Sequence, residues 1–230
     1  LAITYTIYHP TDLRGVVIAL SWLLGFVLCI FLHELGHAFA AKLVGVEVKS
    51  IVIWLLGGFT SLSRKAEKPA HNLAIFAAGP LVNMILGFLF VIAYLLLYLF
   101  APRDIAIESL LWVRAFTRLF FSLAFVNMIL VVFNLLPIYP LDGGNILHST
   151  MELFFGKSNA DLITLIVSLP ILLCLIAFGF FSRDYILLAF CILIALAIGT
   201  LNRSSLRWIN LGINYLFKRG GYYYLQGDFE

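Results

Sequence analysis

The sequence predicts an all-α membrane protein: a polytopic helical bundle of about five transmembrane helices with a short β-hairpin or edge strand near the cytosolic interface. Of the 230 residues, 63% are hydrophobic and only 12% are charged. Soluble domains are about half apolar and about a quarter charged, so lipid must be the main solvent of this chain. No linker, low-complexity tract or internal repeat divides the sequence, and we expect a single membrane domain over residues 1–230.

The expected helices are apolar stretches that are long enough, or nearly so, to cross a hydrocarbon core of about 30 Å. They cover residues 16–41, 73–100, 110–136, 162–181 and 185–201. Only a short polar turn separates the last two, so a tight antiparallel hairpin is expected over 162–201. The candidate catalytic and metal-binding residues lie before this hairpin, and we expect the catalytic core to cover about 16–155.

Basic residues are divided unevenly between the two sides of the membrane if each stretch crosses once. Five lie on one side, namely Arg14, Arg103, Arg114, Arg118 and Arg183. Ten lie on the other side, namely Lys42, Lys49, Arg64, Lys65, Lys68, Lys157, Arg203, Arg207, Lys218 and Arg219. Because cytosolic loops carry the excess of Lys and Arg, the N-terminus is predicted outside and the C-terminus in the cytosol.

Two segments are expected to lie at the interface without crossing. Residues 48–62 are rich in β-branched and large apolar side chains, contain Gly57 and Gly58, and are too short to span, which predicts a strand or hairpin. The tail 203–230 mixes aromatic and basic residues, as interfacial segments do. The net charge of +3 is small and its basic residues are scattered, which excludes a nucleic-acid-binding footprint.

The motif H-E-L-G-H, formed by His33, Glu34 and His37, stands near the cytosolic end of the first stretch. On a helix the two histidines are four residues apart, so both imidazoles project from one face and can bind one zinc ion. Glu34 lies on the flank of that face, where it can serve as a general base without becoming a ligand. The motif also occurs by chance in soluble helices. Within a membrane span, however, unpartnered polar groups cost about a few kcal/mol each, which favours the metal hypothesis.

A third ligand is needed, because catalytic zinc usually takes three protein ligands and a water. The best candidate is Asp142, in the segment N-L-L-P-I-Y-P-L-D-G-G that starts at Asn134. Its prolines stop the helix, and glycines such as Gly143 let backbone approach closely. Irregular backbone at this depth must be buried in protein, so we expect it to lie against the H-E-L-G-H helix. The alternative role for Asp142 is to cap a helix that starts near Asn145.

Other polar residues have weaker functional interpretations. Asn134 either steadies a substrate carbonyl beside the metal or simply ends a helix, and both roles stay open. Asn83, in G-P-L-V-N, is expected to pack between helices and form an interhelical hydrogen bond, with catalysis as the minor role. His9, His71 and His148 are expected to be solvated rather than to bind metal.

Together, H-E-L-G-H, G-P-L-V-N and N-L-L-P-I-Y-P-L-D-G resemble the site-2 protease family of intramembrane zinc metalloproteases, peptidase family M50. The combination is far more specific than either main motif alone, and the similarity covers residues 16 to about 155. No PDZ domain fits between the motifs, so we expect a minimal form of the family.

The resemblance implies that His33, His37 and Asp142 bind one Zn²⁺ per chain, that Glu34 activates water, and that Asn134 assists near the substrate. It also implies that residues 48–62 offer a strand edge to an unwound, membrane-anchored protein substrate. Gly57, Gly58, Asn83 and Gly143 are the expected supporting residues.

The function that follows from the resemblance is peptide-bond hydrolysis in membrane-anchored proteins, close to the cytosolic face of the bilayer. Two alternatives stay open, a membrane zinc transporter and a catalytically inactive binder of membrane proteins. The sequence predicts neither the substrate nor the oligomeric state.

Overall fold

The structure is a computed structural model that describes residues 13–54, 57–101 and 106–201. Its helices are α2 (Leu13–Leu43), α3 (Pro69–Phe100), α4 (Ile107–Asn134), α5 (Asp142–Phe155), α6 (Lys157–Phe181) and α7 (Tyr185–Leu201). Its strands are β1 (Val48–Trp54) and β2 (Gly57–Leu62). The predicted helical bundle with a short hairpin at 48–62 is confirmed. The predicted interfacial tail at 203–230 and His9 lie outside the described residues.

Within the described residues, four helical segments are long and apolar enough to cross a membrane, namely Gly15–Leu43, Pro69–Phe100, Ser109–Asn134 and Lys157–Phe181. They match the first four predicted stretches, and the chain is an integral membrane protein. The fifth stretch is helical too, and the 17 described residues of α7 cover about 25 Å at 1.5 Å per residue, compared with a hydrocarbon core of about 30 Å.

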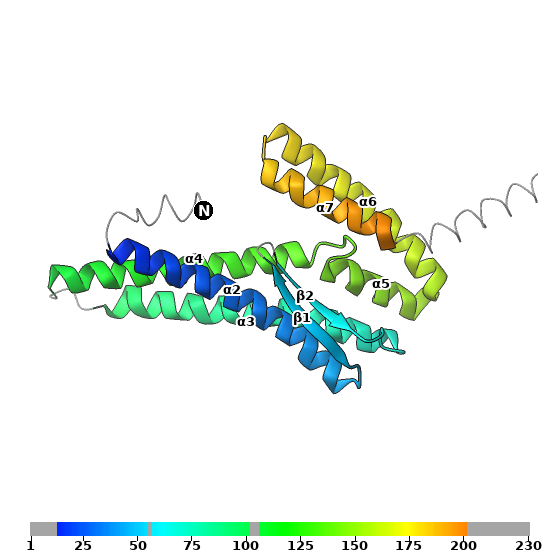
Figure 1. Cartoon of the computed structure of the whole chain (residues 1–230), viewed down its shortest axis with the longest axis horizontal. Helices are drawn as coiled ribbons and strands as arrows, with labels where there is room; N and C mark the ends of the chain where they lie inside the picture. The colour runs from blue at the N-terminus through cyan, green and yellow to red at the C-terminus, as the bar shows by residue number, and fades with distance from the viewer. Residues whose placement is uncertain (1–12, 55–56, 102–105, 202–230) are drawn as a thin grey trace, which may run out of the picture.

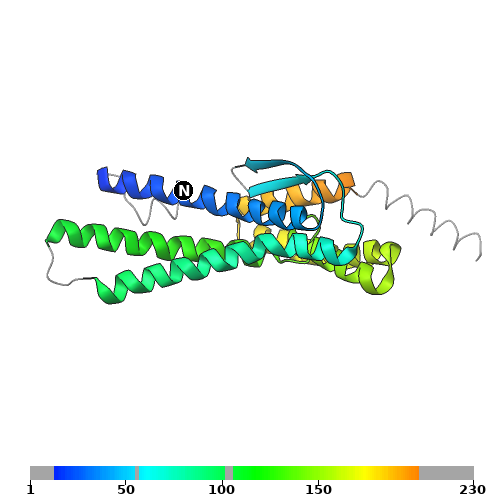
Figure 2. The same ribbon diagram turned by 90° about the horizontal axis from the view of Figure 1, so that it is seen from below.

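The helices form two groups. Figures 1 and 2 show α2, α3 and α4 running side by side along the long axis, with α6 and α7 as a separate pair. The loop from α4 to α5 joins the groups, because the fully buried Ile138 packs with Leu172 of α6 and Cys191 of α7. Phe133 of α4 also meets Phe190 of α7 edge-on, with ring centroids 6.4 Å apart. Apolar packing therefore fixes the loop that leads to Asp142.

The hairpin follows α2 directly and lies along its C-terminal part (Figure 1). The helix ends in a tight turn in which Gly45 has a φ of 76° and the Val46 N–H donates to the Ala41 carbonyl at 2.9 Å. The two strands then pair antiparallel, with Val52 opposite Phe59. This geometry folds β2 back over the end of α2 that carries the H-E-L-G-H motif.

One polar contact joins the short helix α5 to α6. Nε2 of His148 lies 2.8 Å from Oδ1 of Asp161 on α6, and His148 is only 7% exposed. The expectation that His148 is solvated is therefore wrong, because α6 packs over it and supplies a carboxylate. The pair helps to hold α5 against α6.

The turn between α6 and α7 yields a test of the fold. Oδ1 of Asp184 accepts hydrogen bonds from the N–H groups of Ile186 and Leu187, at 3.1 and 3.0 Å. Asp184→Ala removes this N-terminal cap and should destabilise the first turn of α7 by about 0.5–2 kcal/mol. Hydrogen exchange at those two amides in detergent micelles should become faster. Asp184→Asn keeps a capping oxygen and should exchange like the wild type, and unchanged exchange in Asp184→Ala would contradict the cap.

Candidate metal centre

The two histidines of H-E-L-G-H lie one turn apart on the same face of α2. Their Nε2 atoms are 3.1 Å apart and their ring centroids 4.7 Å apart. His33, Glu34 and His37 are all buried, with 5%, 5% and 6% exposure. The 3.6-residue repeat of the helix thus places both imidazoles at one point inside the bundle.

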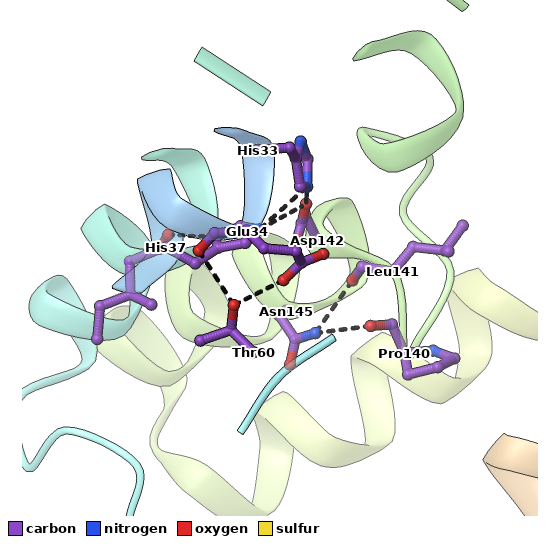
Figure 3. Close-up of polar contacts among 9 residues, drawn as sticks. His33, Glu34, His37, Thr60, Pro140, Leu141, Asp142 and Asn145 are labelled. Carbon is purple, nitrogen blue, oxygen red and sulfur yellow. Dashed lines mark hydrogen bonds and ion pairs between the residues drawn. The ribbon is translucent and has the colours of Figure 1, made fainter. Parts of the chain in front are cut away.

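Asp142 reaches the same point from α5. Its Oδ2 lies 3.1 Å from Nε2 of His33 and 3.3 Å from Nε2 of His37. Figure 3 shows the carboxylate directed toward the two imidazoles. The irregular segment therefore lies against α2, as expected. The alternative role as a helix cap is wrong, because Leu141 is the N-cap of α5 and no side chain caps that helix.

The three groups have the chemistry and spacing of a metal site. One ligand atom from each of His33, His37 and Asp142 lies within 4.8 Å of the others. Ligands at about 2.0–2.1 Å from a tetrahedral zinc ion are about 3.3 Å from one another. The three separations in this chain, 3.1, 3.1 and 3.3 Å, match that value. Two imidazoles and a carboxylate so arranged fit a divalent cation of the zinc type.

A hydrogen bond on the far side of His37 fixes which nitrogen faces the site. Nδ1 of His37 lies 2.7 Å from the carbonyl oxygen of Ile75 on α3. A carbonyl can only accept, so Nδ1 carries the hydrogen and Nε2 of the neutral ring presents its lone pair. That lone pair faces the second imidazole and the carboxylate. Several acceptor atoms that face one point can all be satisfied by a bound cation.

The imidazoles of His33 and His37 also act on the carboxyl group of Asp142. Burial alone would raise its pKa, but the hydrogen bonds and positive charge that the two imidazoles supply when they are protonated outweigh burial and hold the pKa below its ordinary value. The turn before Asp142 is fixed by Asn145, whose Nδ2 donates to the carbonyls of Pro140 and Leu141 at 3.0 and 3.1 Å. Ser168 of α6 also donates to the Pro137 carbonyl at 3.1 Å.

Glu34 does not join the three possible ligands but turns toward β2. Its Oε2 accepts a hydrogen bond from Oγ1 of Thr60 at 2.7 Å (Figure 3). Gly58 lies so close that an added Cβ would be 2.6 Å from Oε1 of Glu34. The hairpin thus covers the carboxylate, and only a residue without a side chain fits at position 58.

Glycines on two other elements bring the neighbouring backbone close to the site. An added Cβ on Gly79 of α3 would lie 2.7 Å from Nε2 of His33 and would overlap the ring of His37. At the start of α5, a Cβ on Gly143 would overlap the carbonyl of Leu135, and Gly144 is similarly close to the backbone of Ile138. The close approach expected for Gly143 is present.

The remaining predicted residues lie outside this cluster. Asn134 is the last residue of α4 and its side chain makes no hydrogen bond within the described residues. Asn83 is 1% exposed, yet its Oδ1 has no partner among the described residues, so the expected interhelical hydrogen bond is not formed. Gly57 has a φ of 154° and no neighbour that an added Cβ would meet. His71 is half-buried at the start of α3 and does not belong to the possible ligand group.

Three contributors were not predicted from the sequence. Thr60 stands beside Ser61 on β2, and nothing in the sequence indicates which of these hydroxyls contacts Glu34. Gly79 is the first residue of G-P-L-V-N, and nothing in that motif indicates that its packing partners are the imidazoles. Asn145 stands three residues after Asp142, a spacing typical of a residue that braces the first turn of a helix.

Comparisons with known proteins agree with this geometry. The model of the family described as peptidase family M50 matches residues 21–108 and 98–177. A Methanocaldococcus jannaschii protein named zinc metalloprotease is 30% identical over 74% of this chain and 47% of its own length. A Synechocystis sp. protein, provisionally named a zinc metalloprotease, is 34% identical over 62% of this chain and 36% of its own. The chain thus spans about a third to a half of the length of these curated relatives.

Among solved structures, the chain is similar to the site-2 protease from Methanocaldococcus jannaschii. The TM-score is 0.59 at 25% sequence identity, over 87% of this chain and 88% of that one. The matched family segments include α2, α3, α4 and α5, which are the helices that build the buried His–His–Asp cluster. The chain belongs to peptidase family M50.

Proposed function

We propose that this chain is an intramembrane zinc metalloendopeptidase that hydrolyses peptide bonds of membrane-anchored proteins. One observation carries the proposal: two imidazoles and a carboxylate converge beside a buried glutamate, inside helices apolar enough to span a membrane. Polar groups within a span are costly unless they are partnered, so three of them gathered at one point favour a functional site. Membership of family M50 and the names of the relatives point to the same activity.

The proposed ligands are His33, His37 and Asp142. A zinc ion held by them would supply Lewis acidity, which makes water nucleophilic near neutral pH and polarises a carbonyl. Contacts within the chain orient the ligands around that ion. The His37 hydrogen bond to the Ile75 carbonyl keeps Nε2 aimed at the site, and the Asp142 carboxylate supplies the anionic oxygen.

Glu34 is the proposed general base. It stands one residue from His33 on α2, and its carboxylate contacts β2 instead of the other three groups. In this position it can take a proton from the attacking water and return it to the leaving amine. Asn134 keeps its proposed role near the substrate carbonyl, since it ends α4 directly before the loop that carries Asp142.

The hairpin is the proposed docking element for the substrate. A peptide bond within a helix is shielded, whereas an extended substrate segment needs partners for its backbone groups in lipid. Strand addition to the β1–β2 sheet would supply those partners beside Glu34. The site is proposed to face the cytosol, because the segment from the end of α2 to the start of α3 carries Lys42, Lys49, Arg64, Lys65 and Lys68.

Metal analysis tests the proposed ligand set. The purified protein in detergent should contain about one zinc ion per chain, and a strong chelator should abolish cleavage of a model membrane-anchored substrate until zinc is restored. Asp142→Asn removes the anionic ligand, so bound zinc should fall to about a tenth or less. Elemental analysis measures both. Full zinc occupancy in Asp142→Asn would remove this residue from the ligand set.

The role of Glu34 is tested by a change that keeps shape and removes basicity. Glu34→Gln should retain about one zinc ion per chain and lose about 10²- to 10⁴-fold in turnover, the usual contribution of a general base. Elemental analysis and a cleavage assay on the same preparation give the two values. Undiminished turnover would mean that Glu34 is not the base.

The packing of α3 against the imidazoles is tested by Gly79→Ala. The new Cβ would displace His33 and His37, so zinc affinity should fall about 10- to 100-fold, as it does when the surroundings of ligands are disturbed. Alanine favours a helix more than glycine does, so a weakened helix would not explain the loss. The matched control is Gly87→Ala on the same helix, where the nearest atom lies 3.5 Å from the added Cβ. Zinc competition titrations should show that only Gly79→Ala weakens binding.

A further inference from the structure

The proposed base is held by a residue from a different element. Oγ1 of Thr60 on β2 lies 2.7 Å from Oε2 of Glu34 and 3.0 Å from the Glu34 backbone oxygen. Within the described part of the chain, Thr60 is the only side chain that forms a hydrogen bond with the Glu34 carboxylate. Glu34 is 5% exposed, and burial makes a hydrogen bond to its carboxylate more important. A hydroxyl that donates to a buried carboxylate makes one of the stronger hydrogen bonds in proteins.

The contact follows from the alternation of a β-strand. Residues two apart share a face of a strand, and Gly58 and Thr60 are two apart on β2. Both lie against Glu34: Thr60 through its hydroxyl and Gly58 through close backbone approach. Phe59 between them is 62% exposed. One face of β2 is therefore shaped around the Glu34 side chain.

We propose that Thr60 is a positioning residue for the reaction: its hydroxyl fixes the Glu34 carboxylate from β2, so that the base and the hairpin move as one unit. A glutamate side chain has several rotatable bonds, and the Thr60 hydrogen bond selects one arrangement of them. This inference rests on the proposed function, because it assigns a role to Thr60 only through Glu34. It implies that a substrate strand added to the hairpin is placed relative to the base by the same β2 backbone.

The test uses Thr60→Val and Thr60→Ser in the full chain. Valine keeps the shape and suits a strand but cannot donate a hydrogen bond, whereas serine keeps the hydroxyl. Thr60→Val should lower kcat about 10- to 100-fold, because a misplaced catalytic group costs about 10²-fold, and should leave KM within about twofold of wild type. Thr60→Ser should restore most of kcat. Both variants should keep about one zinc ion per chain.

A matched control separates this effect from the general loss of a threonine hydroxyl. Oγ1 of Thr117 donates only to the Val113 carbonyl of its own helix, at 2.7 Å. Thr117→Val should therefore leave kcat and KM unchanged. If Thr60→Val does not fold, Thr60→Ala removes the same hydroxyl with less bulk and carries the same expectation.

Several outcomes would overturn the inference. A higher KM with unchanged kcat would mean that Thr60 only stabilises the docking strand. Equal losses in Thr60→Ser and Thr60→Val would show that the hydroxyl does not matter. Loss of zinc in Thr60→Val would place its effect on the metal ligands and not on Glu34.

A measurement without turnover separates this inference from the proposed function. Hydrogen exchange over residues 57–62 should accelerate in both Thr60→Val and Glu34→Ala, because each removes one side of the same contact. If the wild type binds zinc but cleaves no substrate, the proposed function fails, while accelerated exchange in both variants still supports the contact. Normal exchange in both variants contradicts the contact even if the wild type is an active protease.

Discussion

The carboxylate of Asp142 faces the imidazoles of His33 and His37 inside an apolar bundle, at separations of 3.1 and 3.3 Å. Bringing these three polar groups together restricts the backbone conformation and the packing of the neighbouring elements. The loop before α5 must be non-helical to deliver the carboxylate, and protein must surround it, because lipid cannot satisfy free backbone groups. The buried Ile138 meets that need by packing between α6 and α7.

Helix α3 shows how closely the rest of the bundle is shaped around the site. It contributes no side chain to the cluster, yet Gly79 lets its backbone lie against both imidazoles. One turn earlier, the Ile75 carbonyl accepts the hydrogen bond from His37. Pro80 lies in the same stretch and cannot donate to the carbonyl of Phe76, so the regular ladder of α3 is already interrupted near this contact. The helix thus serves as a surface on which the ligands are oriented.

What the sequence predicted, and what it did not, has a physical explanation. His33, Glu34 and His37 were identified because their spacing acts within one helix, and Asp142 because prolines and glycines mark a local break. Contacts between elements leave no such local pattern. Thr60 contacts Glu34 because β2 folds back over α2, and His148 is buried because α6 packs over it and places Asp161 beside it. For the short helix α5, the sequence analysis predicted only a start near Asn145. The rest of this helix packs against α3 and α6, and such packing leaves no local pattern.

The ligands come from two elements that are distant in the sequence. His33 and His37 belong to α2, whereas Asp142 begins α5, which packs against α3 and α6 and whose preceding loop is anchored to α6 by Ser168. An ion bound by all three would therefore act as a cross-link between α2 and α5. Ligand binding stabilises the arrangement that binds it. Ion affinity and the packing of α5 beside α2 are then two measures of one thermodynamic coupling, and a force that separates these helices also loosens the ion.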